Sequence, residues 1–92
     1  MRLESSIQAQ ILRELKKLDG FAYKHPPYPA GMPDIHFIYN GISFFFEVKR
    51  SKKHKPTKLQ KHRHKQLRKV GCIVKVVTSW GEVKDILSKY MS

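Results

Sequence analysis

The sequence predicts an α/β domain whose mixed sheet carries helices on both faces, in the order helix, three strands, helix, strand, helix. Apolar side chains recur at helical spacing over residues 3–18, an Asn-Gly pair separates two apolar runs, and a β-branched run at 72–77 follows a basic helical segment. A strand reached through a helix favours a right-handed crossover, so we expect this run to lie parallel to the preceding strand. The 92 residues are expected to form one domain, 1–92.

The composition limits the classes of function. The net charge of +12 indicates a polyanionic partner, nucleic acid first and an anionic membrane second. A basic protein of the ribosomal or chromatin-like kind is the alternative on composition alone. No apolar run is long enough to span a bilayer and no secretory signal is seen, so no membrane partner and a cytoplasmic location are expected. The single cysteine, Cys72, fits a reducing compartment.

The first helix is expected to extend to Leu18, with Asp19-Gly20 ending it, because glycine is favoured just past a helix end. Glu4 lies in its first turn. There it either interacts favourably with the helix dipole or reaches an acidic site at the sheet edge. A short strand is expected at 21–24.

Residues 25–33 form a stiff loop, because four prolines fall within them. The loop leads directly to Asp34, so it is expected to form the rim of a site. His25 and Tyr28 are candidates for substrate contact there, although surface residues without a role are common in loops.

Two strands joined at Asn40-Gly41 are expected to build the site. Asn-Gly between apolar runs predicts a two-residue type I′ turn with positive φ at both positions. Counting outward from this turn, Asp34 faces Glu47 across the hairpin. Lys49 lies two residues beyond Glu47 and therefore projects from the same face. The register predicts a cluster of two acids and a lysine at one end of the hairpin.

The two carboxylates would repel each other in such an apolar hairpin, which makes sense if a cation lies between them. Carboxylate oxygens hold Mg²⁺ or Mn²⁺ with water sites left open, and a metal ion held in this way can support phosphodiester hydrolysis. Asp34 and Glu47 are therefore the proposed direct ligands. A structural salt-bridge cluster is the alternative interpretation.

A second helix is predicted after the hairpin. Pro56-Thr57 indicates its start with Thr57 as the N-cap, and Gly71 ends it. Its apolar stripe is expected to be thin and to consist of Leu59, Gln66 or Leu67, and Val70. Ser79 and Glu82 then predict a capping box for the last helix.

Residues 50–69 carry ten of the nineteen lysines and arginines, and no acidic residue occurs from 48 to 81. A solvated helix face normally mixes charges of both signs, so phosphate contact is the favoured interpretation. Binding should then depend strongly on salt, because counterions are released. The expected DNA contacts are Lys52, Lys53, Lys55, Lys58, Lys61, Arg63 and Lys65.

A zinc site is the competing metal hypothesis. The available side chains show no Cys-x-x-Cys pair, and His62 and His64 fall on different helix faces. Histidines that contact phosphate or are merely solvated are therefore favoured over zinc ligands.

The spacing of Pro33-Asp34, twelve residues, and Glu47-Val48-Lys49 resembles the PD-(D/E)XK nuclease signature. The closer resemblance is to the VRR-NUC family of that superfamily. It rests on helical Glu4, Gly31-Met32-Pro33-Asp34, Glu47-Val48-Lys49, Gln60 and Gly71. The loop before Gly31 departs from the family pattern, since it is rich in proline and has no arginine. Substrate contacts are therefore not carried over to that loop.

The resemblance implies a restriction-endonuclease-like fold and a Mg²⁺- or Mn²⁺-dependent DNA endonuclease. It adds the Val48 carbonyl and Glu4, directly or through water, to the metal ligands. Lys49 would orient the attacking water and stabilise negative charge. Gln60 would position the lysine, the water or the phosphate. The implied catalytic residues are Glu4, Asp34, Glu47, Lys49 and Gln60.

Stand-alone members of the family occur in phages and prophages and resemble homodimeric Holliday-junction resolvases. The resemblance therefore implies branched DNA, a homodimer and a phage or prophage origin. A dimer would also compensate for the modest core of a short chain. An exposed Trp80 or the first helix is a candidate for its interface. A flap or other structure-specific nuclease is the nearest alternative, and a non-catalytic basic nucleic-acid-binding module is the second class.

Overall fold

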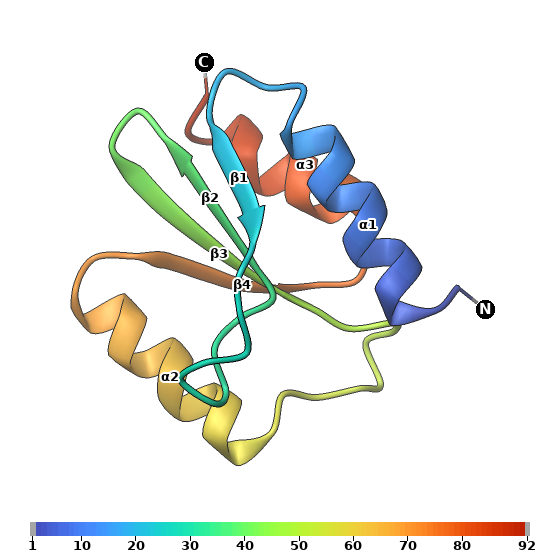
Figure 1. Cartoon of the computed structure of the whole chain (residues 1–92), viewed down its shortest axis with the longest axis vertical. Helices are drawn as coiled ribbons and strands as arrows, with labels where there is room; N and C mark the ends of the chain where they lie inside the picture. Colours follow the sequence, from blue (N-terminus) through green and yellow to red (C-terminus); the bar gives the residue numbers. More distant parts are fainter. Residues whose placement is uncertain (1, 92) are drawn as a thin grey trace.

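The computed structural model describes residues 2–91. Its order of elements confirms the predicted succession of one helix, three strands, a helix, a strand and a helix (Figure 1). The elements are α1 (Glu4–Leu15), β1 (Phe21–Lys24), β2 (Ile35–Tyr39), β3 (Ile42–Val48), α2 (Lys58–Lys69), β4 (Ile73–Val77) and α3 (Trp80–Ser88).

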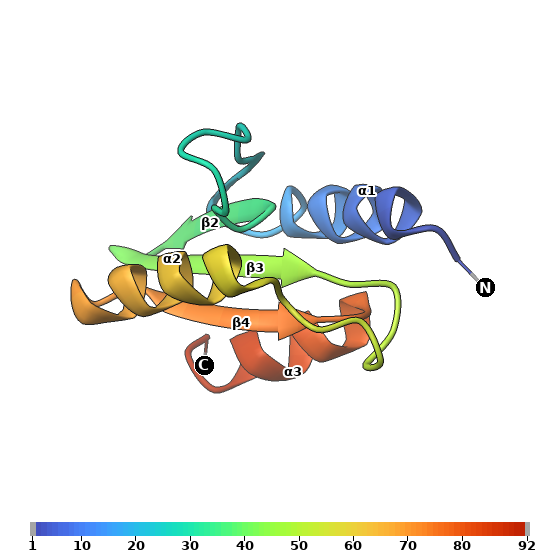
Figure 2. The same cartoon turned by 90° about the horizontal axis from the view of Figure 1, so that it is seen from below.

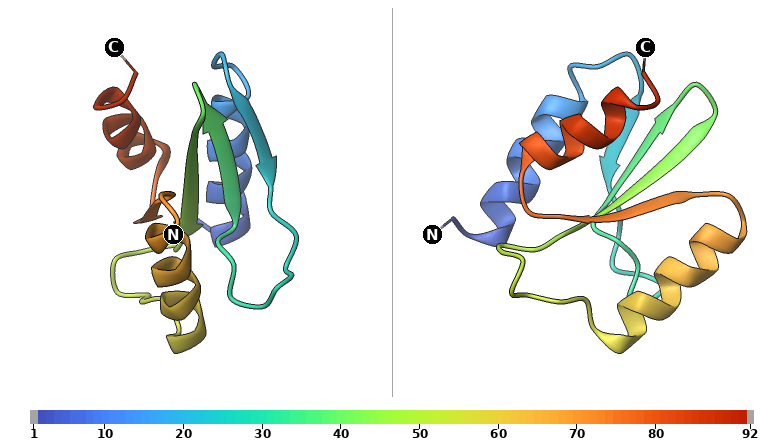
Figure 3. Two further views of the ribbon diagram at one scale, coloured as in Figure 1. Left: turned by 90° about the vertical axis from the view of Figure 1, so that its left-hand side faces the viewer. Right: turned by 180° about the vertical axis from the view of Figure 1, so that it is seen from behind.

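The four strands form one sheet in the order β1-β2-β3-β4. The first three strands are antiparallel, and β4 lies parallel to β3 as predicted. The helices α1 and α3 lie together on one face, whereas α2 lies on the other (Figures 1 and 3). The predicted mixed sheet with helices on both faces is therefore confirmed. None of the helices between residues 2 and 91 is long and apolar enough to cross a membrane.

The β2–β3 hairpin has the predicted register. Tyr39 pairs with Ile42 and Ile35 pairs with Phe46, on either side of a two-residue turn. Asn40 and Gly41 both adopt positive φ, 53° and 79°, which the type I′ turn requires. This register determines which residues lie side by side at the polar end of the hairpin.

The apolar core lies between the sheet and the pair α1 and α3. Side chains that alternate along β2 and β3 point into it, because successive residues of a strand face opposite ways. Its buried members include Ile7, Ile11, Leu15, Ile35, Phe37, Phe44, Phe46, Val48, Val77, Val83 and Leu87.

The first helix is shorter than predicted. It ends at Leu15, with Lys16 as the C-cap. Gly20 is required for a different reason, because a Cβ atom there would lie 2.7 Å from the Phe37 ring. The chain turns closely over the core at this point, and only glycine leaves room for it.

The start and end of α2 are as predicted, but its inward stripe is not. Thr57 caps the helix and Gly71 follows its end with φ of 96°. Leu59 and Val70 are 44% and 77% exposed, so these two members of the predicted apolar stripe are wrong, whereas Leu67 is half-buried. The buried residue of α2 is His64. The reason is that α2 packs over a polar part of the sheet.

Only one of the two hydrogen bonds of the predicted capping box forms at the start of α3. Ser79 Oγ accepts from the Glu82 N–H at 3.2 Å, as predicted. The Glu82 carboxylate accepts from the Thr78 hydroxyl at 2.9 Å, so it does not close the box on Ser79. Trp80 is half-buried against the core, and the prediction of an exposed Trp80 is wrong.

Candidate active site

The polar end of the hairpin places Asp34 beside Glu47. The Asp34 N–H donates to the Phe46 carbonyl at 3.1 Å, which extends the ladder one residue beyond β2. The Val48 N–H donates to Asp34 Oδ2 at 2.7 Å. This bond holds the Asp34 carboxyl against the end of β3, next to Glu47.

The surroundings of Asp34 disfavour its ionised form. Burial raises the pKa of Asp34 from 3.8 to about 7, and the charge of Glu47 adds to the effect. The Val48 N–H opposes it by stabilising the carboxylate. Glu4 makes a smaller contribution in the same direction as Glu47. Negative charge at this end of the hairpin therefore lacks full compensation within the protein.

The Glu47 carboxylate is 1% exposed and is held from α2. His64 Nε2 lies 3.2 Å from its Oε1. Gln60 Nε2 donates to its Oε2 at 3.3 Å. Lys49 Nζ lies 3.9 Å from the same oxygen. Both carboxylate oxygens thus have polar partners, which a buried carboxylate needs.

Gln60 connects the start of α2 to the candidate active site. Its Oε1 accepts from the Thr57 N–H at 2.8 Å, while the Gln60 N–H donates to Thr57 Oγ1 at 3.1 Å. The same Oε1 accepts from Lys49 Nζ at 3.1 Å. Since Oε1 faces two donors, the amide nitrogen must face Glu47. The amide orientation is therefore determined by this network.

His64 is the residue that sequence reasoning missed. It was predicted to be solvated or to contact phosphate, yet it is 2% exposed and contacts Glu47. Because a carboxylate only accepts, His64 Nε2 carries the hydrogen. The available signal was its position four residues after Gln60, which places both on one helix face.

Glu4 is half-buried at the start of α1, and its charge acts on Asp34. Among residues 2–91, however, no three His, Cys, Asp or Glu side chains are grouped closely enough to hold a metal ion. Within this part of the chain, Glu4 does not complete a preformed ligand trio. The donor set is two carboxylates, whose hard oxygens suit Mg²⁺ or Mn²⁺ with several waters retained.

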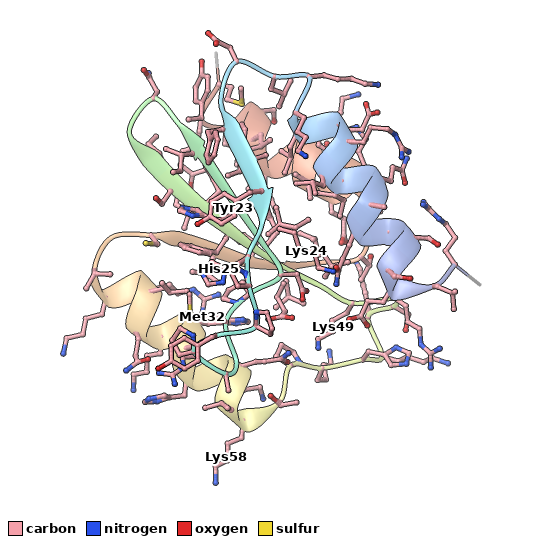
Figure 4. The ribbon with its side chains drawn as sticks, in the orientation of Figure 1. Tyr23, Lys24, His25, Met32, Lys49 and Lys58 are labelled. Atoms are coloured by element: carbon pink, nitrogen blue, oxygen red, sulfur yellow. The ribbon has the colours of Figure 1, made fainter. Side chains whose placement is uncertain are left out.

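The predicted DNA contacts lie on the segment before α2 and on α2 itself. Two of them also have partners in the protein. Lys52 Nζ is 3.5 Å from Glu82 Oε2, and Arg63 Nε donates to the Ala30 carbonyl at 2.8 Å. Lys58 extends away from the molecule (Figure 4). The positions are Lys52, Lys53 and Lys55 before the helix and Lys58, Lys61, Arg63 and Lys65 within it.

A solved structure described as a VRR_NUC domain matches this chain with a TM-score of 0.79 and 31% sequence identity. The match covers 97% of each chain. The chain belongs to the VRR-NUC family. A second solved structure, described as a VRR_NUC domain protein, has a TM-score of 0.79 at 20% identity and covers 99% of this chain and 90% of its own, which supports the fold. No family model and no curated protein matches the sequence.

Membership in VRR-NUC confirms the family resemblance seen in the sequence and makes this chain a nuclease-family domain. The family motif residues now have physical reasons. Gly31 adopts φ of 86°, and a Cβ atom there would lie 2.7 Å from Leu59 Cγ on α2. Pro33 is buried and precedes Asp34, which lies immediately before β2. The Gly-x-Pro-Asp segment thus lets the loop pack against α2 and places Asp34 beside Glu47.

Proposed function

We propose that this VRR-NUC domain is a Mg²⁺- or Mn²⁺-dependent endonuclease that cuts branched DNA and resolves four-way junctions as a homodimer. The observation that carries the proposal is the position of the Lys49 ammonium group. This group is held 3.1 Å from Gln60 Oε1, next to the paired carboxylates of Asp34 and Glu47. A cation beside a metal site stabilises the negative charge that develops when a phosphodiester is cut.

The proposed metal ligands are the carboxylates of Asp34 and Glu47 and the backbone carbonyl of Val48. Glu4 would act directly or through water. The raised pKa of Asp34 supports this assignment, because burial and the charge of Glu47 both disfavour the carboxylate, and a divalent cation would offset both. When bound, Mg²⁺ or Mn²⁺ would polarise the phosphate and lower the pKa of a bound water.

The residues of the chain would then share the remaining tasks. Lys49 would orient the attacking water and stabilise negative charge that develops on the phosphate. Gln60 would hold Lys49 through Oε1 and Glu47 through Nε2. His64 would fix the second oxygen of Glu47 from the buried side. These contacts preorganise the site, so little reorganisation is needed during the reaction.

The basic surface would bind the phosphates on either side of the cut. Six of the twelve residues of α2 are lysine or arginine, and α2 also supplies Gln60 and His64 to the site. DNA that lies along this helix would therefore pass beside Lys49. A four-way junction needs two symmetric cuts, which is the reason for proposing two active sites in a dimer.

A cleavage assay tests the nuclease proposal. The protein is incubated with Mn²⁺ or Mg²⁺ and four-way junction, flap or linear duplex DNA, beside Asp34→Asn, Glu47→Gln and Lys49→Ala. We expect cutting by the unaltered protein and strong loss in all three variants. Lys84→Gln on α3 removes the same charge as Lys49→Ala at a surface position and should remain active. Equal inactivity of wild type and variants, with DNA binding retained, would favour the non-catalytic module.

The substrate and the assembly are separate measurements. Symmetric nicking of the junction supports a resolvase, whereas cutting only near the base of a flap selects the alternative nuclease. The mass of the protein in solution, free and on DNA, tests the dimer. A strict monomer on DNA would contradict the resolvase assignment and leave the metal-dependent nuclease intact.

A further inference from the structure

A cavity of about 420 Å³ opens beside Asp34, between the loop of residues 25–33 and the start of α2. Its size falls in the range of ligand sites in proteins, about 300–1,000 Å³. Its floor includes Asp34 and Gln60, so it adjoins the candidate active site. Its walls include Lys24, His25, Pro26 and Pro27.

The loop that forms one wall is fixed in place. Arg63 Nε donates to the Ala30 carbonyl at 2.8 Å, which ties the loop to the middle of α2. Gly31 lies directly against Leu59, with no room for a Cβ atom. The prolines restrict the backbone further. The cavity is therefore preformed, and a ligand entering it does not have to order the loop (Figure 2 shows the loop standing beside α2).

The His25 ring is also held in position. Its Nδ1 donates to the Pro26 carbonyl at 2.7 Å, because a carbonyl can only accept. The ring centre lies 6.1 Å from that of Tyr23 and 6.0 Å from that of Phe45. His36 connects these two neighbours, since it accepts from or donates to the Tyr23 hydroxyl at 2.7 Å and stacks on Phe45 at 4.1 Å. His25 is thus supported by a packed aromatic cluster.

The cavity combines flat ring surfaces with one cation. Lys24 is exposed at the end of β1 and forms no ion pair with residues 2–91. Lys24, His25 and Met32 lie in the same part of the molecule as Lys49 (Figure 4). Proline and imidazole rings offer a stacking surface for a base, and a lysine offers a contact for a phosphate.

We propose that this cavity binds one unpaired nucleotide of the DNA strand that is cut. Its base would stack against the His25 ring and the neighbouring prolines, and its phosphate would contact Lys24. A base in a duplex is stacked and paired, so only a nucleotide that has left the duplex can enter a cavity of this kind. The inference rests on the proposed nuclease function, and it assigns the substrate feature that the site recognises.

Binding in the presence of EDTA tests the inference without cleavage. Two duplexes of equal length are compared, one fully paired and one with a single unpaired fluorescent adenine analogue. We expect the unpaired nucleotide to tighten binding about tenfold, the effect of stacking one base. We also expect the analogue's fluorescence to change when the protein binds.

The variants Lys24→Gln and His25→Ala should reduce that preference while leaving affinity for the paired duplex within about twofold. His25→Phe retains a flat ring and should retain most of the preference. Lys84→Gln removes the same charge as Lys24→Gln at a position on α3 that does not line the cavity, and it should behave like wild type. Circular dichroism of each variant confirms that it is folded.

The inference is overturned if wild type shows no preference, or if the preference persists in both Lys24→Gln and His25→Ala. It is also overturned if the two duplexes lose affinity equally, because Lys24 would then be a general contact. The two proposals fail separately. A protein that prefers the unpaired nucleotide but cuts nothing with Mg²⁺ or Mn²⁺ retains the nucleotide site, whereas one that cuts without preference retains only the nuclease.

Discussion

The two faces of the β2–β3 hairpin differ in what they bury. The face under α1 and α3 buries aromatic and aliphatic side chains such as Phe37, Phe44 and Phe46, each 0% exposed. The face toward α2 buries Phe45 and Glu47, and His64 of α2 is buried against Glu47; Glu47 and His64 are 1% and 2% exposed. Both faces therefore bury side chains, but only the face toward α2 buries a carboxylate.

The difference indicates a division of tasks. Burial of apolar side chains stabilises the fold without directional requirements. Burial of Glu47 requires a polar partner for each oxygen, and burial of Asp34 beside the charge of Glu47 raises the pKa of Asp34. The α2 face thus contributes less to stability and holds its polar groups in fixed positions, a combination that is common at active sites. Substitutions on the two faces should separate stability from activity.

The largest expected effect is on the apolar face. Phe44→Ala should lower the free energy of unfolding by about 3–5 kcal/mol, because it removes a fully buried ring and leaves a cavity. Phe21→Ala is the matched control, since Phe21 is 63% exposed, and it should change stability by only about 0.5 kcal/mol or less. Urea denaturation measures both. Equal losses would show that burial in the core does not determine what Phe44 contributes to stability.

The next effect separates the helix cap from the active site. Gln60→Ala removes the contacts to Lys49 and Glu47 and should lower the cleavage rate by about 10²-fold, the cost of misplacing a catalytic group. Thr57→Ala breaks the same cap but leaves those contacts available, so it should cost about 1 kcal/mol of stability with a smaller loss of rate. Single-turnover cleavage and thermal unfolding measure the pair. A rate loss in Thr57→Ala as large as in Gln60→Ala would assign Gln60 to the cap alone.

A third substitution should stabilise the protein. The raised pKa of Asp34 means that the folded state binds this proton more tightly than the unfolded state. Its contribution to stability is therefore full below the ordinary pKa of 3.8 and is lost as pH rises through about 7. Asp34→Asn keeps an acceptor for the Val48 N–H and removes this loss. The melting temperature without metal should rise at pH 8 by about 4 °C, the shift for about 1 kcal/mol in a small domain.

The same substitution should have little effect at pH 3, where Asp34 is protonated in both states. Melting curves at the two pH values provide the comparison. An equal change at both would mean that the effect of Asp34→Asn does not come from its charge.

The smallest expected effect concerns the outer surface of α2. Replacing Lys58, Lys61 and Lys65 by glutamine should reduce the dependence of binding on salt. The slope of log K against log salt concentration should change by about 0.9 for each phosphate that the protein no longer neutralises. Lys84→Gln on α3 is the single-charge control, and binding titrations at several salt concentrations measure the slope. An unchanged slope in the triple variant would remove this surface from the DNA interface.

Local rules predicted much of the fold from the sequence. The Asn40-Gly41 turn determined the hairpin register, and that register brought Asp34 to Glu47. Thr57 was found because capping depends on residues close in sequence. The end of α1 was predicted wrongly, because the need for Gly20 arises from its contact with Phe37, which is distant in sequence.

The site was predicted only in part for a similar reason. Lys49 and Glu47 followed from the strand pattern, but His64 lay in a strongly basic segment and was assigned to solvent. Its burial depends on the way α2 docks over Glu47, which local pattern does not reveal. The cavity beside Asp34 depends on two contacts between the loop and α2. Gly31 lies against Leu59, and Arg63 donates to the Ala30 carbonyl. Contacts between distant segments decide both features.

The twelve-residue helix α2 carries six lysines and arginines and no acid. Like charges four residues apart, such as Lys61 and Lys65, destabilise a helix by about 0.2–0.5 kcal/mol per pair. The first turn of this self-repelling helix also holds Lys49 through Gln60. Phosphates along α2 would relieve the repulsion and keep that turn wound. Bound DNA would therefore act as a counterion that stabilises the helix from which Gln60 contacts Lys49.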